Sequence, residues 1–239
     1  MVESIIGGDN DLINSSSLIK TSYQFKLIII GESNVGKTSL YIRYTENKFD
    51  PNVKTNICID FKAKTITLGT LETVKLLIWD TAGSEKYRSI AYSYYKNAQG
   101  ILLCFDITNR RSFDELKNFW KGFIDEYLET GNANNKVCLV YLIGTKLDLA
   151  RERKVSVEEA TEVAKQFEGK YFETSALTGE NVNLAFLEFT KHLVEKYDSI
   201  KVNISKEEGV KLRKDSYFYK DGVSTFSKYQ NDSTSSYCC

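Results

Sequence analysis

The residue types best suited to chemistry lie in one octapeptide, Gly31-Glu32-Ser33-Asn34-Val35-Gly36-Lys37-Thr38. It has the form G-x-x-x-x-G-K-[ST] and stands between an apolar run, Phe25–Ile30, and a segment from Ser39 that can continue a helix. Backbone N–H groups of such a turn converge on one point, where the helix dipole favours an anion. Lys37 adds a positive charge for phosphate groups, and the Thr38 hydroxyl suits Mg²⁺. The segment therefore predicts a phosphate-binding loop; the alternative is a glycine-rich turn that binds nothing.

Three further polar segments each follow an apolar run, as the phosphate loop does. They are Asp80-Thr81-Ala82-Gly83, Thr145-Lys146-Leu147-Asp148 and Ser175-Ala176. Ligands of mostly parallel α/β sheets bind at the carboxyl ends of the strands, so we expect all four segments to surround one site. Asp80 can hold Mg²⁺ through a water, and Gly83 lets a backbone N–H approach a γ-phosphate closely.

If the phosphates belong to a nucleotide, Asp148 is the candidate residue for recognising its base. A carboxylate facing a purine edge accepts two N–H bonds from guanine, at N1 and at the 2-amino group, and adenine lacks both donors. Leaving the carboxylate unpaired would cost a few kcal/mol, so such a site prefers guanine. The aliphatic stem of Lys146 can cover the plane of the base.

Hydrophobic patterning predicts the elements that position these loops. Strands are expected near residues 24–30, 57–67, 74–79, 101–105, 137–143 and 171–172, and helices near 37–46, 111–129, 156–167 and 182–197. Their alternation predicts a doubly wound, mostly parallel, six-stranded α/β sheet. The strand near 57–67 should be antiparallel, because a short turn joins it to the next strand. The residues expected on its one buried face are Ile57, Ile59, Phe61, Ala63 and Ile66.

The composition fits a soluble globular protein: 239 residues, 42% hydrophobic, 27% charged and zero formal net charge. Zero net charge gives no basis for bulk binding to nucleic acid, and no apolar run is long enough to span a bilayer. The single histidine, His192, lies in an expected helix, which disfavours histidine-based nucleophilic catalysis. Residues 1–22 are expected to form a flexible extension, 23–197 one domain, and 198–239 a flexible tail.

The motifs resemble those of the Rab family of small GTPases, in the Ras superfamily, over about residues 24–197. The matching segments are Ile57-Cys58-Ile59-Asp60-Phe61-Lys62, Lys75–Gly83, Tyr87-Arg88-Ser89-Ile90, Tyr94-Tyr95-Lys96-Asn97-Ala98, Phe105-Asp106-Ile107-Thr108-Asn109 and the pair Cys238-Cys239. The resemblance implies a P-loop GTPase fold and a GTP or GDP ligand with Mg²⁺. It further implies that residues 47–58 form switch I and that about 80–97 form switch II.

The resemblance also assigns roles to single residues. Phe49 would stack on the guanine, and the region of Ser175 and Ala176 would contact the base. The residues implied in nucleotide binding are Gly31, Glu32, Ser33, Asn34, Val35, Gly36, Lys37, Thr38, Ser39, Phe49, Asp80, Thr81, Ala82, Gly83, Thr145, Lys146, Asp148, Ser175 and Ala176. Those implied as metal ligands are Thr38, Asn56 and Asp80, and those in catalysis Lys37, Gly83 and Ser84. The effector-facing residues would be Val53, Lys54, Thr55, Asn56, Ile57, Cys58, Ile59, Asp60 and Phe61.

Several positions depart from the family pattern. Asn56 stands where the family has the threonine that ligates Mg²⁺; its amide oxygen lies one atom further out, so switch I should be held less firmly. If Thr55 were the Mg²⁺ ligand instead, the chain would have to shift by one residue. This shift would turn the side chains of the following strand to the opposite faces of the sheet. Ser84 replaces the glutamine that orients the attacking water and is too short for that role, so intrinsic hydrolysis should be slow. Cys58 replaces a glycine. Thr145 replaces an asparagine, but Rho-like proteins carry Thr-Lys-x-Asp, so guanine specificity should survive.

Cys238-Cys239 resembles the signal for double geranylgeranylation, and two lipid chains suffice for stable anchoring. The alternative is an unmodified reactive tail. The resemblance implies a monomer on the cytoplasmic face of an intracellular membrane, with a possible cytosolic pool, that regulates vesicle trafficking. The partners implied are effectors, exchange factors, GTPase-activating proteins and prenyl chaperones.

Two functions stay open at this point. One is a GTPase that cycles between GDP and GTP. The other is a non-cycling, GTP-bound membrane adaptor that recruits effectors without significant catalysis, a reading that Asn56 and Ser84 favour. An ATP-using P-loop kinase is disfavoured by Asp148.

Overall fold

The computed structural model describes residues 20–53, 60–69, 72–81, 96–131 and 138–207. The chain divides into two compact units, Met1–Asp198 and Ser199–Cys239. The account below concerns the first unit, together with the helical residues 199–207. The predicted domain boundaries stay predictions, because most of residues 1–22 and 198–239 lie outside the described residues.

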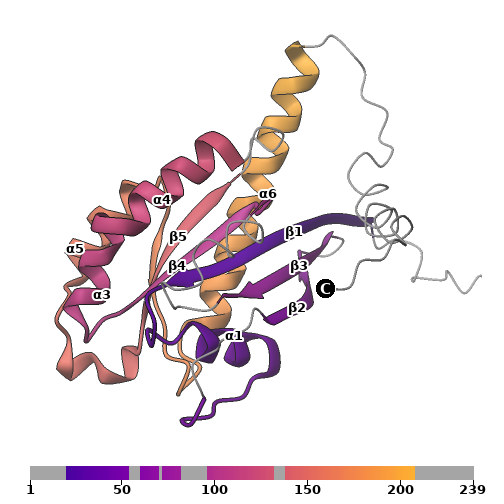
Figure 1. Cartoon of the computed structure of the whole chain (residues 1–239). Helices are drawn as coiled ribbons and strands as arrows, with labels where there is room; N and C mark the ends of the chain where they lie inside the picture. The colour runs from indigo at the N-terminus through magenta and orange to yellow at the C-terminus, as the bar shows by residue number, and fades with distance from the viewer. Residues whose placement is uncertain (1–19, 54–59, 70–71, 82–95, 132–137, 208–239) are drawn as a thin grey trace, which may run out of the picture. The chain divides into compact units, whose positions relative to one another are not determined.

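A six-stranded sheet forms the centre of the first unit (Figure 1). Its strands are β1 Lys20–Gly31, β2 Asp60–Leu68, β3 Glu72–Asp80, β4 Gly100–Asp106, β5 Leu139–Thr145 and β6 Tyr171–Glu173, in the order β2-β3-β1-β4-β5-β6. Only β2 runs antiparallel to its neighbour, with Phe61 paired to Trp79, and the other described pairs are parallel. The prediction of a mostly parallel sheet with one antiparallel strand is confirmed.

Helices cover both faces of the sheet (Figure 1). The long expected helix near 111–129 is a continuous run of α- and π-helical turns: α3 Arg110–Glu115, η3 Leu116–Trp120, α4 Lys121–Glu126 and η4 Tyr127–Gly131. This run and α5 Val157–Lys165 lie on one face, and α1 Lys37–Glu46 and α6 Val182–Glu207 lie on the other. A 3-10 segment, η5 Leu147–Glu152, follows β5.

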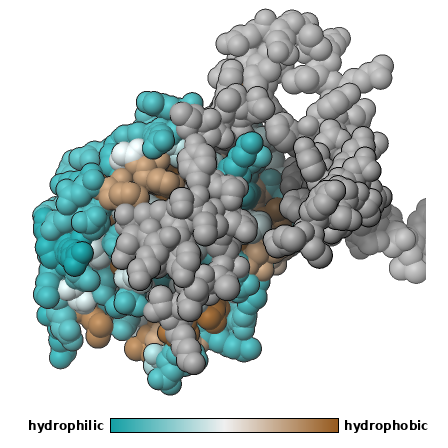
Figure 2. Space-filling view, viewed as in Figure 1, coloured by the Kyte–Doolittle hydropathy of each residue, from teal (hydrophilic) through white to brown (hydrophobic). Residues whose placement is uncertain are grey.

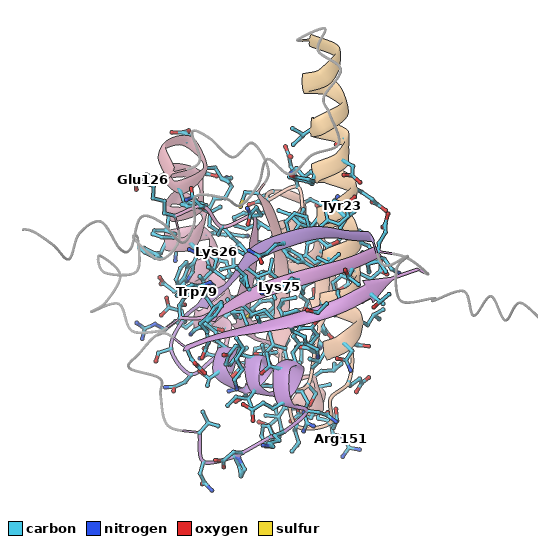
Figure 3. All side chains as sticks on the ribbon, turned by 90° about the vertical axis from the view of Figure 1, so that its right-hand side faces the viewer. Tyr23, Lys26, Lys75, Trp79, Glu126 and Arg151 are labelled. Carbon is cyan, nitrogen blue, oxygen red and sulfur yellow. The ribbon has the colours of Figure 1, made fainter. Side chains whose placement is uncertain are left out.

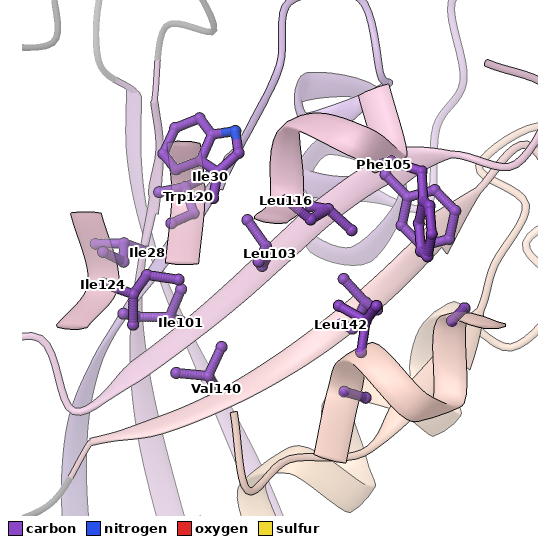
Figure 4. Packing of buried hydrophobic residues seen from close by; sticks show 14 of the residues in the cluster. Ile28, Ile30, Ile101, Leu103, Phe105, Leu116, Trp120, Ile124, Val140 and Leu142 are labelled. Carbon is purple, nitrogen blue, oxygen red and sulfur yellow. The ribbon is translucent and has the colours of Figure 1, made fainter. Parts of the chain in front are cut away.

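A hydrophobic core lies between the sheet and the α3–α5 layer (Figure 4). Ile28, Ile101 and Leu103 from the strands pack there with Leu116 and Trp120 from η3, all at most 5% exposed. This packing explains the helical stripe in the sequence, because a helix on a sheet buries one apolar face. The core fixes β1, β4 and β5 side by side, so their carboxyl ends form one edge.

The predicted buried face of β2 is wrong at Phe61 and Ala63, which are exposed, and right at Ile66, which is half-buried. Phe61 is 44% exposed, whereas Lys62 and Lys64 on the opposite face are half-buried against α1. The Lys64 amine donates to Tyr44 O (2.5 Å) and lies 3.9 Å from the centre of the Tyr44 ring. Long lysine stems cover apolar surface, and their cationic ends favour aromatic faces, so two lysines occupy the side expected to be apolar.

Helix α6 is also longer than expected. It ends at Glu207, not near Tyr197, where the apolar periodicity fades. Residues 198–207 contain neither glycine nor proline, so nothing in their chemistry stops the helix.

Candidate functional site

The phosphate-binding loop connects the end of β1 to the start of α1, as predicted. Gly31 has φ 138° and Gly36 has φ 92°, values that L side chains rarely adopt. A Cβ atom on Gly31 would lie 2.2 Å from Cys104 O, so the loop can run this close to β4 only with glycine there. Helix α1 then begins at Lys37, and its first backbone N–H groups face the loop.

Lys37 lies inside this loop and is 5% exposed. Its amine donates to Gly31 O (3.0 Å) and to Glu32 O (2.6 Å). Burial lowers the pKa of Lys37, while the nearby carboxylates Asp80 and Glu32 oppose that change. Burial also raises the pKa of the Cys104 thiol to about 12, so this neighbour is neutral and leaves the lysine charge available to an anion.

A hydroxyl and a carboxylate meet beside the loop. Thr38 Oγ1 donates to Asp80 Oδ2 at 2.7 Å, and Asp80 is fully buried. The neighbouring Thr81 hydroxyl bonds to Ile29 O (2.7 Å), which fixes the end of β3 against β1. Two hard oxygen donors at this spacing fit Mg²⁺, which keeps waters and phosphate oxygens as its other ligands. The described residues contain no cluster of three or more acidic, His or Cys side chains.

Asp148 lies at the other end of the same sheet edge. Ser175 Oγ donates to Asp148 Oδ1 (2.5 Å) and accepts from the N–H of Thr178 (3.1 Å). The serine thus fixes one carboxylate oxygen and leaves the group facing the cavity. This is the arrangement that can accept two N–H bonds from a purine edge.

Lys146 is held by a residue that the sequence analysis did not include in the site. Its amine lies 2.6 Å from Asp106 Oδ2, and the Asp106 side chain is 7% exposed. Lys146 has φ 64°, so a left-handed residue turns the chain from β5 into η5. Asp106 ends β4, one strand away from Lys146. The sequence signal that could have identified Asp106 as a site residue is its position at the end of a buried strand.

These groups surround one cavity of about 340 Å³, a size typical of small-molecule sites. The predicted nucleotide-binding residues that line it are Ser33, Asn34, Gly36, Lys37, Thr38, Ser39, Phe49, Thr81, Thr145, Lys146, Asp148 and Ala176. The other described residues of the predicted set do not line the cavity; they are Gly31, Glu32, Val35, Asp80 and Ser175. Sequence reasoning missed the lining residues Leu40, Asp50, Pro51, Leu149, Thr174 and Leu177, and placed Val53 in the effector region only.

Several predicted residues lie outside the described residues. From the expected switch II these are Ala82, Gly83 and Ser84, and from the expected switch I they are Lys54, Thr55, Asn56, Ile57 and Cys58. Ile59 of the expected effector-facing surface and the pair Cys238 and Cys239 also lie outside.

A glycine-rich loop around a buried lysine, the Thr38–Asp80 hydrogen bond and the Asp148 carboxylate lie at one edge of a mostly parallel sheet. They define the class, a P-loop α/β protein. Comparison with known proteins agrees. The sequence model of the Ras family matches residues 26–195. Ras-related protein Rab-1 of Theileria parva is 44% identical over 174 residues, which cover 73% of this chain and 76% of that protein.

Two further relatives show the same likeness. Ras-related protein rab-39 of Caenorhabditis elegans is 42% identical over 176 residues, or 74% of this chain and 76% of the relative. Ras-related protein RABC1 of Arabidopsis thaliana is 37% identical over 226 residues, which cover 95% of this chain and 98% of that protein. The chain therefore belongs to the Rab family of small GTPases in the Ras superfamily, a family of GTP hydrolases that bind GTP and GDP.

Proposed function

We propose that this protein is a GDP/GTP-dependent switch whose nucleotide occupies the 340 Å³ cavity. The observation that carries the proposal is that the Asp148 carboxylate, which Ser175 fixes, and the buried Lys37 line the same cavity. Guanine would bind at Asp148 with Phe49 against the ring, and the phosphates would bind at Lys37. Thr38 and Asp80 would hold Mg²⁺, which neutralises charge on the phosphates when bound.

Binding of guanine and adenine nucleotides by the purified protein tests this assignment. GDP and GTP should bind at least about 100-fold more tightly than ADP and ATP, because a bound adenine would cover the Asp148 carboxylate without giving it either N–H donor. Comparable affinity for ATP would support a P-loop enzyme of another kind and contradict the proposal.

The rate of hydrolysis is a separate proposal, which rests on Ser84 and Asn56. We propose that intrinsic hydrolysis is slow, since a serine hydroxyl is too short to orient the attacking water. Single-turnover GTP hydrolysis checks it, and Ser84→Gln should raise the rate. An ordinary Rab-like rate that Ser84→Gln leaves unchanged would overturn the idea. A non-cycling adaptor is the second candidate, and it predicts GTP rather than GDP in the purified protein.

Membrane attachment is proposed through geranylgeranyl groups on Cys238 and Cys239, on the cytoplasmic face of an intracellular membrane, where the protein would regulate vesicle trafficking. Among the described residues, no helix is both long and apolar enough to cross a bilayer. Two prenyl chains would supply the anchor, and a prenyl chaperone would hold the cytosolic pool. Mass spectrometry of the cellular protein tests this proposal. A C-terminal peptide that carries no prenyl mass would contradict it.

Partner proteins are proposed to bind next to switch I. Phe61 is exposed, and its ring lies 4.8 Å from that of Trp79, while most of the described surface in Figure 2 is hydrophilic. Trp79 is half-buried, so Phe61 is an exposed aromatic ring held in place by a second ring, and aromatic side chains are enriched at protein interfaces. Effectors should bind the GTP form of the monomer, and Phe61→Ala should weaken that binding while leaving GTP affinity unchanged. Exchange factors and GTPase-activating proteins are expected partners by family.

A further inference from the structure

Arg43, on the last turn of α1, uses all three nitrogens of its guanidinium group in hydrogen bonds. Nε donates to Ala176 O (2.6 Å), and Nη2 donates to Leu177 O (2.9 Å). Nη1 donates to Asn47 O (3.1 Å) and to Asn47 Oδ1 (3.3 Å). One half-buried side chain therefore joins two segments that are far apart in the sequence.

Both segments carry or adjoin residues that line the cavity. Ala176 and Leu177 line the cavity and follow Ser175, which holds Asp148. Asn47 lies two residues before Phe49, which also lines the cavity. Arg43 itself is not among the lining residues, so its effect on a bound base is indirect.

The chain around Asn47 is fixed from two sides. Asn47 caps α1 with φ 55°, and its backbone N–H donates to Arg43 O (3.0 Å). The Arg43 guanidinium binds the carbonyl of the same residue, so both the helix end and its cap are tied to one arginine. Asparagine tolerates this left-handed conformation, which sets the direction in which the chain leaves for Phe49.

The loop of Ala176 and Leu177 is bonded within itself at its ends. Gly179 N donates to Ser175 O (2.9 Å), and Ser175 N donates to Glu180 O (3.1 Å). These bonds set the shape of the loop but not its distance from α1. The two bonds from Arg43 set that distance.

We infer that Arg43 is a positioning residue for guanine recognition, holding the Asn47–Phe49 segment and the Ser175–Leu177 loop at the spacing that the base requires. The inference rests on the proposed function and goes beyond it, because it assigns specificity to a residue outside the cavity. A planar guanidinium presents its donors in a fixed fork, so it can serve carbonyls on both segments at once. A lysine amine is a point donor and cannot.

The test compares GDP with inosine diphosphate, which lacks the 2-amino group that Asp148 would accept. In the GDP-loaded full-length protein, Arg43→Met should speed GDP dissociation at least about tenfold, equivalent to about 1.4 kcal/mol. It should also lower the ratio of GDP affinity to inosine diphosphate affinity, since a displaced loop loses the 2-amino contact. A general loosening of the domain would weaken both nucleotides equally and leave the ratio unchanged.

Two further variants complete the design. Arg151→Met removes an exposed arginine of η5, well away from the sheet face in Figure 3, and should leave both measurements at wild-type values. Arg43→Lys keeps the positive charge but loses the forked set of donors, so its dissociation rate and affinity ratio should lie between those of the wild type and Arg43→Met. If Arg43→Met does not fold, Arg43→Lys provides the test.

The outcomes are separable. A wild-type protein that does not bind GDP refutes the proposed function itself. If the wild type binds GDP, an Arg43 variant with an unchanged affinity ratio overturns this inference, whether or not its dissociation is faster.

Discussion

The hydroxyl of Thr145 lies 2.5 Å from Val35 O and 2.9 Å from Phe105 O. Thr145 ends β5, next to Lys146, and Val35 belongs to the phosphate-binding loop. The hydroxyl therefore ties the Thr145–Asp148 loop to the phosphate-binding loop. The two halves of the cavity are coupled through one side chain.

Thr145→Val should weaken GDP binding about tenfold. Valine has nearly the same shape but no donor, and a buried carbonyl left without its partner costs about 1–3 kcal/mol. The GDP dissociation rate measures the effect. Thr161→Val is the matched control, because Thr161 Oγ1 bonds to Val157 O (2.7 Å) on α5, away from the site. Equal rates for the two variants would contradict the coupling.

Asp106→Asn should weaken GDP binding about threefold to tenfold. Asparagine keeps the size of the side chain and an oxygen for Thr108, but Lys146 loses its charged partner. Because one partner is nearly buried and the other partly exposed, we expect about 1 kcal/mol, between the values for exposed and buried ion pairs. Equilibrium binding measures it. Asp114→Asn breaks an exposed pair with Arg110 and should change nothing.

Asp148→Asn should change the base preference from guanine to xanthine. An amide at this position can accept from N1–H and donate to the xanthine 2-oxo group, whereas the carboxylate repels that oxygen. Competition between GDP and xanthosine diphosphate gives the preference directly. A variant that still prefers GDP as strongly as the wild type would show that Asp148 does not contact the base.

The partial burial of Lys26 should make the stability of the protein depend on pH. Its amine donates to Lys96 O (2.9 Å) and lies 5.0 Å from the centre of the Trp79 ring, on the sheet face visible in Figure 3. Burial lowers the pKa of Lys26 from 10.5 to about 8. Between these values the unfolded chain keeps a proton that the folded protein has released, so stability rises with pH through this window.

Lys26→Met should therefore stabilise the GDP-bound protein at pH 7 by about 1–2 kcal/mol, after allowance for partial exposure. The gain should shrink as the pH rises from 8 to 10.5. Chemical denaturation across this range measures it. Lys75→Met, on the exposed part of neighbouring β3, is the control and should show no such trend.

The features that could be predicted from the sequence are those that local interactions determine. The phosphate-binding loop needs glycines at fixed positions, and α1 has the predicted bounds Lys37–Glu46. The order of strands and helices followed from hydrophobic periodicity, which records which face of each element is buried. The predicted buried face of β2 was wrong at Phe61 and Ala63. Phe61 and Ile66 lie on opposite faces of a strand with a two-residue period, and lysine stems can take the place of apolar residues.

The sequence by itself determined the family, the fold class and the chemistry of the four loops, since each loop is read from neighbouring residues. Only the tertiary structure decided what holds these loops together. Arg43 and Ala176 are separated by 133 residues, and Lys146 reaches Asp106 on the next strand. Such contacts have no local pattern, because they arise when the sheet and its helices bring distant segments to one edge.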